Sequence, residues 1–114
     1  MNLAYSRTPG ARYMQRARQL KAKFWPHLTP DEAVAAYDKL LIEQKDRCVL
    51  CGKHKSEFKT ALAVDHCHDT GIVRGLLCNK CNRFEVGRHT LETARQLVAY
   101  LEKSYDNKNK KESA

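Results

Sequence analysis

The spacing of hydrophobic positions along the chain predicts helices toward both ends and a short β-hairpin between them. Residues 11–24 are compatible with a helix that stops near Trp25-Pro26, because proline and the residue before it disfavour helical geometry. A second helix is expected from Thr29, where a threonine cap, a following proline and Glu32 form a capping box. Apolar residues at helical spacing then carry this helix to about Lys45. They are Val34, Tyr37, Leu40 and Leu41.

The middle of the chain predicts a hairpin followed by a helix. The apolar run 61–64 predicts one strand, Asp69-Thr70-Gly71 predicts a turn, and residues 72–77 predict the returning strand. A helix is expected from about Cys78 to about Gly87. Helices before and after a two-stranded hairpin place the chain in the α+β class.

A last helix is expected after Thr90, whose hydroxyl suits an N-cap. Apolar residues follow it at helical spacing and make one stripe. The stripe consists of Leu91, Ala94, Leu97, Val98 and Leu101. We interpret it as core, with a self-association face as the alternative.

Charge divides the 114 residues into three regions, with a formal net charge of +8. Residues 1–28 contain no acid and form a basic N-terminal arm, residues 29–104 form the folded domain, and residues 105–114 form a flexible polar tail. The arm carries Arg7, Arg12, Arg16, Arg18, Lys21 and Lys23. This asymmetry favours nucleic-acid phosphate as the partner, and we expect the arm to supply affinity but not chemistry. The alternatives are a solvated basic face, or an arm packed on the helix that starts at Thr29 with Trp25 as its anchor.

The chain has neither an apolar N-terminal run of the export type nor a stretch of transmembrane length. Five cysteines in such a chain favour a reducing compartment and metal thiolates over disulfides. We therefore expect a cytoplasmic protein. No membrane partner is expected, because the basic arm lacks a broad apolar face.

Two Cys-x-x-Cys pairs frame the predicted hairpin. Each pair can form a tight knuckle that presents two thiolates to one ion, and two knuckles complete a tetrahedron. The four ligands would be Cys48, Cys51, Cys78 and Cys81. We expect structural Zn²⁺, with a redox pair or an iron–sulfur cluster as alternatives. Cys67 is left over, and we expect it to be a small, buried apolar filler.

A second group of polar side chains lies inside this frame and directly after it. The group consists of Asp65, His66, His68, Asn82 and Glu85. Carboxylate and amide oxygens suit a hard cation such as Mg²⁺ or Mn²⁺, and a neutral imidazole beside it can take a proton from water. Taken singly, each histidine could be structural and Asn82 could be a helix cap. The combination favours a catalytic site, in which Asn82 and Glu85 share one helical face.

These motifs resemble the phage recombination endonuclease VII family, which belongs to the HNH, ββα-metal or His-Me finger nucleases. The matching motifs are Cys48-x-x-Cys51, Val64-Asp65-His66-Cys67-His68, Thr70-Gly71-x-Val73-Arg74-Gly75-Leu76-Leu77-Cys78 and Cys81-Asn82. The resemblance covers about residues 28–87. It implies a small zinc-stapled ββα-metal finger, here flanked by N- and C-terminal helices, that holds one divalent cation.

By this resemblance His66 is the general base, while Asp65 and Asn82 bind Mg²⁺ or Mn²⁺. It also implies that Glu85 and His68 support catalysis, although Val86 here separates that glutamate from the following glycine. The implied reaction is hydrolysis of DNA to a 5′ phosphate and a 3′ hydroxyl, with Arg74 and the basic arm holding the DNA backbone. A non-catalytic zinc module that binds DNA or RNA is the main alternative, and a phage recombination or packaging accessory is another.

Junction-resolving members of that family carry a substantial C-terminal region and work as dimers, whereas this chain has one helix and a polar tail there. The resemblance therefore supports nuclease chemistry in this chain better than it supports resolution of branched DNA. It leaves open whether the chain forms a homodimer. The substrate could be duplex, nicked or branched DNA. Asp65 and His66 would point to opposite faces of a regular strand, so a shared site requires the chain to leave strand geometry there.

Overall fold

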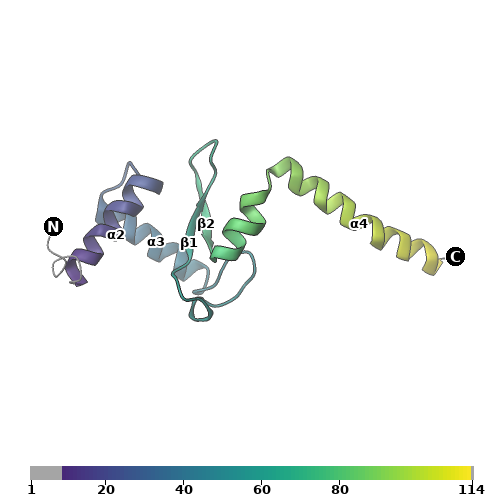
Figure 1. The fold of residues 1–114 in the computed structure, drawn as a ribbon, viewed down its shortest axis with the longest axis horizontal. Helices are drawn as coiled ribbons and strands as arrows, with labels where there is room; N and C mark the ends of the chain where they lie inside the picture. The colour runs from purple at the N-terminus through teal and green to yellow at the C-terminus, as the bar shows by residue number, and fades with distance from the viewer. Residues whose placement is uncertain (1–8, 114) are drawn as a thin grey trace. The chain divides into compact units, whose positions relative to one another are not determined.

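The structure, a computed structural model, describes residues 9–113, and Arg7 lies outside the described residues. Its main elements are α2 (Pro9–Phe24), α3 (Pro30–Glu43), β1 (Ala63–His66), β2 (Val73–Leu77) and α4 (Leu91–Ser113) (Figure 1). The short helical segments are η1 (Lys55–Glu57), η2 (Cys81–Glu85) and η3 (Val86–Arg88). These elements confirm the α+β class. They form two compact units, one ending at Asn79 and the other beginning at Lys80.

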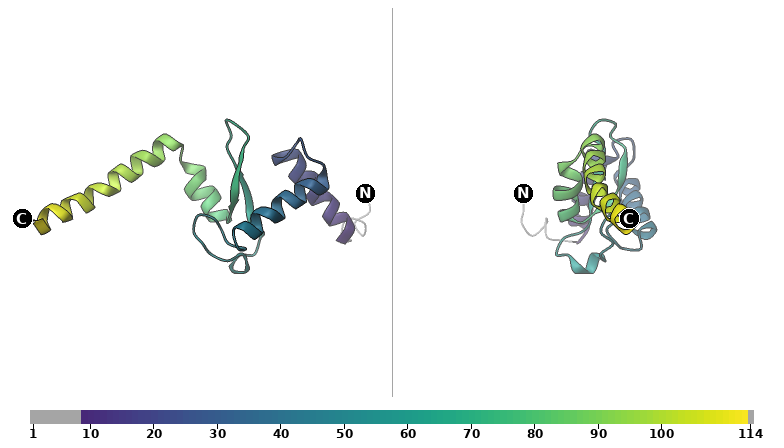
Figure 2. Two further views of the ribbon diagram at one scale, coloured as in Figure 1. Left: turned by 180° about the vertical axis from the view of Figure 1, so that it is seen from behind. Right: turned by 90° about the vertical axis from the view of Figure 1, so that its right-hand side faces the viewer.

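Helix α2 packs on α3, so the N-terminal segment is part of the first unit (Figure 1, Figure 2). The buried residues of the two helices and the turn between them are Ala11, Ala17, Leu20, Trp25, Ala33 and Tyr37. The hydroxyl of Tyr13 donates to Asp31 over 2.8 Å, and the guanidinium of Arg16 lies 4.5 Å from the ring centre of Tyr37. The packing alternative is therefore confirmed for this segment, with Trp25 buried at its end.

Helix α3 begins as the sequence predicts and leads the chain to the first cysteine pair. Thr29 and Glu32 exchange two hydrogen bonds in a complete capping box. After Glu43 the chain turns through Lys45 and Asp46, both with positive φ, and reaches Cys48. This turn fixes where the first knuckle stands relative to the helix.

Strands β1 and β2 form the expected antiparallel hairpin, but its register breaks near the carboxyl end of β1. Asp65 lies opposite Gly75 and His66 lies opposite Val73, which leaves Arg74 as an extra residue on β2. Such a bulge locally twists and bends a strand. The register break falls between Asp65 and His66, but the extra residue is on β2, and β1 remains a strand through His66, two residues further than the apolar pattern suggests. The chain therefore does not leave strand geometry at His66 in the way that a shared site requires.

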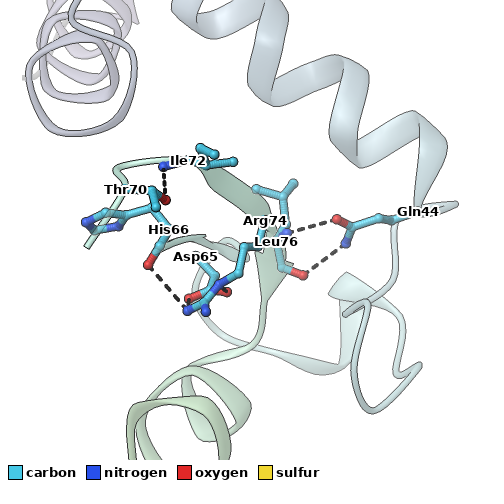
Figure 3. Close-up of polar contacts among 7 residues, drawn as sticks. All are labelled: Gln44, Asp65, His66, Thr70, Ile72, Arg74 and Leu76. Atoms are coloured by element: carbon cyan, nitrogen blue, oxygen red, sulfur yellow. Dashed lines mark hydrogen bonds and ion pairs between the residues drawn. The ribbon is translucent and has the colours of Figure 1, made fainter. Parts of the chain in front are cut away.

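The side chain of Gln44 completes the hydrogen bonding of β2 from the end of α3. Its amide nitrogen donates to the carbonyl oxygen of Leu76 over 2.9 Å, and its oxygen accepts from the Leu76 N–H over 2.8 Å (Figure 3). Leu76 is fully buried, so these backbone groups need a partner. A methyl group on Gly75 would lie 3.2 Å from this amide oxygen and 3.3 Å from Val49. Glycine therefore allows the close approach of α3 to the hairpin.

The second unit contains helical segments of three kinds. Residues 79–88 are helical as predicted, but η2 has π geometry and η3 has 3-10 geometry. Thr90 caps α4, because its hydroxyl accepts from the Thr93 N–H over 3.1 Å. Helix α4 continues to Ser113, through residues that composition assigned to a polar tail, since lysine and glutamate there are good helix formers.

The apolar stripe of α4 is not core, and that interpretation is wrong. Leu91, Leu97, Val98 and Leu101 are between 42% and 68% exposed. Helical spacing indicates which face of a helix is apolar, but it does not indicate whether another element covers that face. Among residues 9–113, no helix combines the length and apolar content that crossing a membrane requires.

Candidate metal centre and catalytic site

The four predicted cysteine ligands lie together. Cys48, Cys51, Cys78 and Cys81 have their sulfur atoms within 4.8 Å of one another, and the sulfurs of Cys51 and Cys78 are 3.9 Å apart. A tetrahedral zinc with bonds of about 2.3 Å to sulfur separates its ligand sulfurs by about 3.8 Å. The cluster therefore has the dimensions and the chemistry of a structural zinc site.

The first knuckle prepares Cys48 to bind as a thiolate. Burial raises the pKa of this thiol, but backbone N–H groups of Cys51, Cys78 and Leu50 oppose the effect and lower the pKa to about 6. The carbonyl oxygen of Cys48 accepts from the N–H of Gly52, whose φ of 78° favours glycine. Tight backbone turns thus supply both the position and the ionisation of a zinc ligand.

Cys67 is not the buried apolar filler that the sequence suggests. It is half-buried in the turn of the hairpin, where its carbonyl oxygen accepts from Gly71 and its N–H donates to Ile72. A side-chain hydrogen bond with Thr70 lowers the pKa of its thiol, and backbone N–H groups of Thr70 and Asp69 lower it further. The turn places this sulfur among polar groups because the strands have already ended.

Asp65 is a buried carboxylate held by Arg74. Nε of Arg74 donates to one carboxylate oxygen over 2.7 Å, and Nη2 donates to the other over 3.0 Å (Figure 3). The same Nη2 lies 3.4 Å from the carbonyl oxygen of His66. The Asp65 side chain is only 10% exposed, whereas that of Arg74 is 48% exposed. The hydrogen bond with Asp65 raises the pKa of Arg74, against a smaller lowering by partial burial.

The ring of His66 points away from this ion pair (Figure 3) and contacts two other rings. Its imidazole centre lies 5.2 Å from the ring centre of Phe24, with an angle of 65° between the planes. The ring centre of His68 lies 4.7 Å from that of His66. The structure therefore brings His66 together with His68, as predicted, and with the end of α2, which was not predicted.

Asn82 and Glu85 both lie in η2, in the second unit. Asn82 is half-buried and Glu85 is exposed. In the wider π turn they do not share a face in the way that α-helical geometry would arrange, and such turns are frequent at functional sites. A methyl group on Gly87 would lie 2.7 Å from the carbonyl oxygen of Asn82, so only glycine lets the chain pass there.

The basic side chains of α2 have different environments. Arg12, Arg18 and Lys23 are exposed. The guanidinium of Arg16 stacks on Tyr37, and Nζ of Lys21 donates to the Pro26 carbonyl over 2.7 Å. The first three are therefore free to meet a polyanion, while the other two have structural contacts as well.

Two residues that matter to the site were missed in the sequence. Phe24 contacts His66, and Gln44 fixes β2 next to Arg74. The aromatic residue just before Trp25 could have drawn attention to Phe24, but the sequence does not indicate that its partner is His66. No local pattern reveals the second. Carboxylate oxygens such as those of Asp65 are the ligand type that a hard cation prefers, and here both oxygens are paired with Arg74.

Comparison with known proteins gives a family and two relatives. The family model described as recombination endonuclease VII matches residues 20–103. The Gene 59 protein of Mycobacterium phage D29 is 40% identical over 78 residues, which make up 67% of this chain and 44% of that protein. The Gene 59 protein of Mycobacterium phage L5 is 43% identical over 60 residues, or 51% of this chain and 36% of that protein. The matched segments thus cover less than half of either relative. No solved structure matches the chain at a significant level.

Proposed function

The chain belongs to the recombination endonuclease VII family, and from this premise we propose that it is a metal-dependent DNA endonuclease of the HNH type. The observation that carries the proposal is the break in register between Asp65 and His66, in a hairpin that the four clustered cysteines frame in the sequence. The carboxylate of Asp65 pairs with Arg74, while the neighbouring imidazole of His66 contacts Phe24, so the two proposed catalytic side chains have different partners. Bulges are frequent next to active sites.

In the proposed reaction His66 accepts a proton from a water molecule, which attacks the phosphorus in line. The bond from phosphorus to the 3′ oxygen breaks, leaving a 5′ phosphate and a 3′ hydroxyl. Asp65 and Asn82 would hold Mg²⁺ or Mn²⁺, and Glu85 and His68 would support the site. The bound ion would neutralise the phosphate and the charge that develops on the leaving oxygen.

The chain would hold DNA through phosphate contacts rather than base contacts. Arg74 pairs with the proposed catalytic residue Asp65, and exposed basic residues lie along α2. Such contacts position the protein on the duplex without reading its sequence. Duplex, nicked and branched DNA are all open as substrates, and a homodimer stays a prediction.

A second function is favoured by one observation. Both oxygens of Asp65 are engaged by Arg74, an arrangement that a purely structural ion pair would also have. On that reading the protein is a non-catalytic zinc module that binds DNA or RNA, or an accessory in phage recombination or packaging. It would then bind nucleic acid without cutting it.

A nicking assay separates these functions. Zinc-loaded protein is incubated with supercoiled plasmid without divalent cation, with Mg²⁺ and with Mn²⁺. The nuclease proposal expects relaxed or linear plasmid only with the cation. Binding to plasmid without cleavage under all three conditions would contradict it. Linear duplex, flap and four-way substrates would then define the cleavage preference.

A further inference from the structure

We propose that Arg74 is a resident counter-ion of Asp65 which the divalent cation displaces, and that the released guanidinium then binds DNA phosphate. The inference rests on the proposed role of Asp65 as a metal ligand and adds a coupling between metal and DNA. The ion pair would thus be the metal-free form of the site. DNA and metal would each favour the same rearrangement.

The first support is the completeness of the pairing. Two nitrogens of Arg74 meet the two oxygens of Asp65 in a fork, at 2.7 and 3.0 Å. Charge-assisted pairs of this geometry are the strong ones among hydrogen bonds. Each oxygen keeps a free lone pair, but a cation that binds there brings positive charge against the guanidinium and so weakens its pairing with Asp65.

The second support is the difference in exposure between the partners. The Asp65 side chain is 10% exposed, and Asp65 is paired with Gly75 across the hairpin. The Arg74 side chain is 48% exposed. Arg74 is also the extra residue of the bulge, so no residue on β1 lies directly opposite it. The carboxylate is the fixed partner, and the guanidinium is the one that can move into solvent.

The third support is the charge that the site must compensate. A buried carboxylate without a counter-ion is costly, and breaking such a pair by removing one partner destabilises a protein. Exchange of Arg74 for a divalent cation keeps Asp65 compensated throughout. Because the Arg74 side chain is 48% exposed, the released guanidinium would be open to a phosphate that binds the same cation.

Such an exchange couples two binding events. Removing the competing guanidinium should strengthen cation binding, and the presence of the cation should free one positive charge for DNA. By linkage, a phosphate that holds Arg74 away from Asp65 strengthens cation binding by the same factor. A static ion pair predicts neither effect.

The first arm of the test measures cation binding in the absence of DNA. Calorimetric titration of Mn²⁺ into zinc-loaded protein compares the parent with Arg74→Gln and Arg74→Lys, with Arg95→Gln on α4 as a control for the loss of one charge. Because a half-exposed pair is screened by solvent, Arg74→Gln should bind Mn²⁺ roughly 3- to 10-fold more tightly. Arg74→Lys keeps the charge but loses the fork, so a smaller gain is expected. Unchanged or weaker Mn²⁺ binding in both folded Arg74 variants would overturn the proposal.

Asp65→Asn in the same titration distinguishes the two levels of inference. If Asp65→Asn leaves Mn²⁺ binding intact, the ligand assignment in the proposed function has failed. If it abolishes Mn²⁺ binding while the Arg74 variants bind like the parent, only the exchange has failed. Zinc content and thermal midpoint are measured for each variant, and Arg74→Lys remains informative if Arg74→Gln does not fold.

The second arm measures DNA binding across a salt series, in a His66→Ala background that prevents cleavage. With Mn²⁺ present, Arg74→Gln should reduce the salt slope of duplex binding by about 0.9, the value for one phosphate contact. Without Mn²⁺ the two slopes should coincide, because Arg74 is already neutralised by Asp65. Equal reductions with and without Mn²⁺, or none in either condition, would contradict the exchange.

Discussion

The ring of Phe24 lies 5.2 Å from the imidazole of His66, inclined at 65°, so the last residue of α2 contacts the proposed general base. Trp25, the next residue, is buried and holds this end of the helix through two backbone hydrogen bonds. The N-terminal segment therefore contacts a residue that is proposed to act in catalysis. This contact argues against the expectation that the segment supplies affinity alone.

Phe24→Ala should reduce the single-turnover rate of DNA cleavage by roughly 3- to 30-fold, because a less restrained His66 imidazole spends less time in reactive geometry. The affinity for DNA should hardly change, since no charge is lost. Single-turnover rates at saturating DNA and binding isotherms measure the two quantities. Phe24→Tyr should recover most of the rate, and Arg18→Ala on the same helix should weaken binding instead. A normal single-turnover rate in Phe24→Ala would remove the positioning role.

Zinc should determine whether the central region folds. Four thiolates on Zn²⁺ contribute apparent binding free energy of about 10 kcal/mol in small peptides, comparable to the stability of a whole domain. Cys81→Ser should therefore lose zinc and unfold the hairpin, while Cys67→Ser should keep both because Cys67 lies outside the cluster. Metal analysis and thermal unfolding measure these effects. A Cys81→Ser protein with parental zinc content and midpoint would exclude the four-thiol site.

Gln44→Ala should destabilise the first unit by about 1–3 kcal/mol, because it removes the acceptor of the buried Leu76 N–H, while the Leu76 carbonyl keeps its bond from the Val49 N–H. Glu43→Ala is the matched control one residue earlier, since its ion pair with Lys39 is exposed and contributes little. Urea denaturation of the zinc-loaded proteins measures the difference. Equal stability of the two variants would mean that water replaces the Gln44 amide without cost.

Local signals in the sequence are sufficient for the elements that depend on neighbouring residues. The capping box of Thr29 and Glu32, the cap at Thr90 and the cysteine knuckles all form as predicted. In each case the interacting groups lie within a few residues of one another, so residue type and spacing determine the geometry.

Features that depend on distant partners were not predictable. The contact of Phe24 with His66 and the bridge from Gln44 to Leu76 join residues from different elements. The bulge at Arg74 depends on the pairing of both strands, and the exposure of the α4 stripe depends on which other elements pack against it. Periodicity along one segment contains none of this information.

The central claim is that His66 has a catalytic role and not only a structural one, and His66→Ala tests this claim most directly. A zinc-loaded His66→Ala protein should keep its thermal midpoint, zinc content and DNA affinity, because His66 is neither a zinc ligand nor a fully buried residue. Its single-turnover cleavage rate with Mg²⁺ should fall by roughly 10²–10⁴-fold, the usual contribution of a positioned base. A folded His66→Ala protein that cuts DNA at the parental rate would contradict the account.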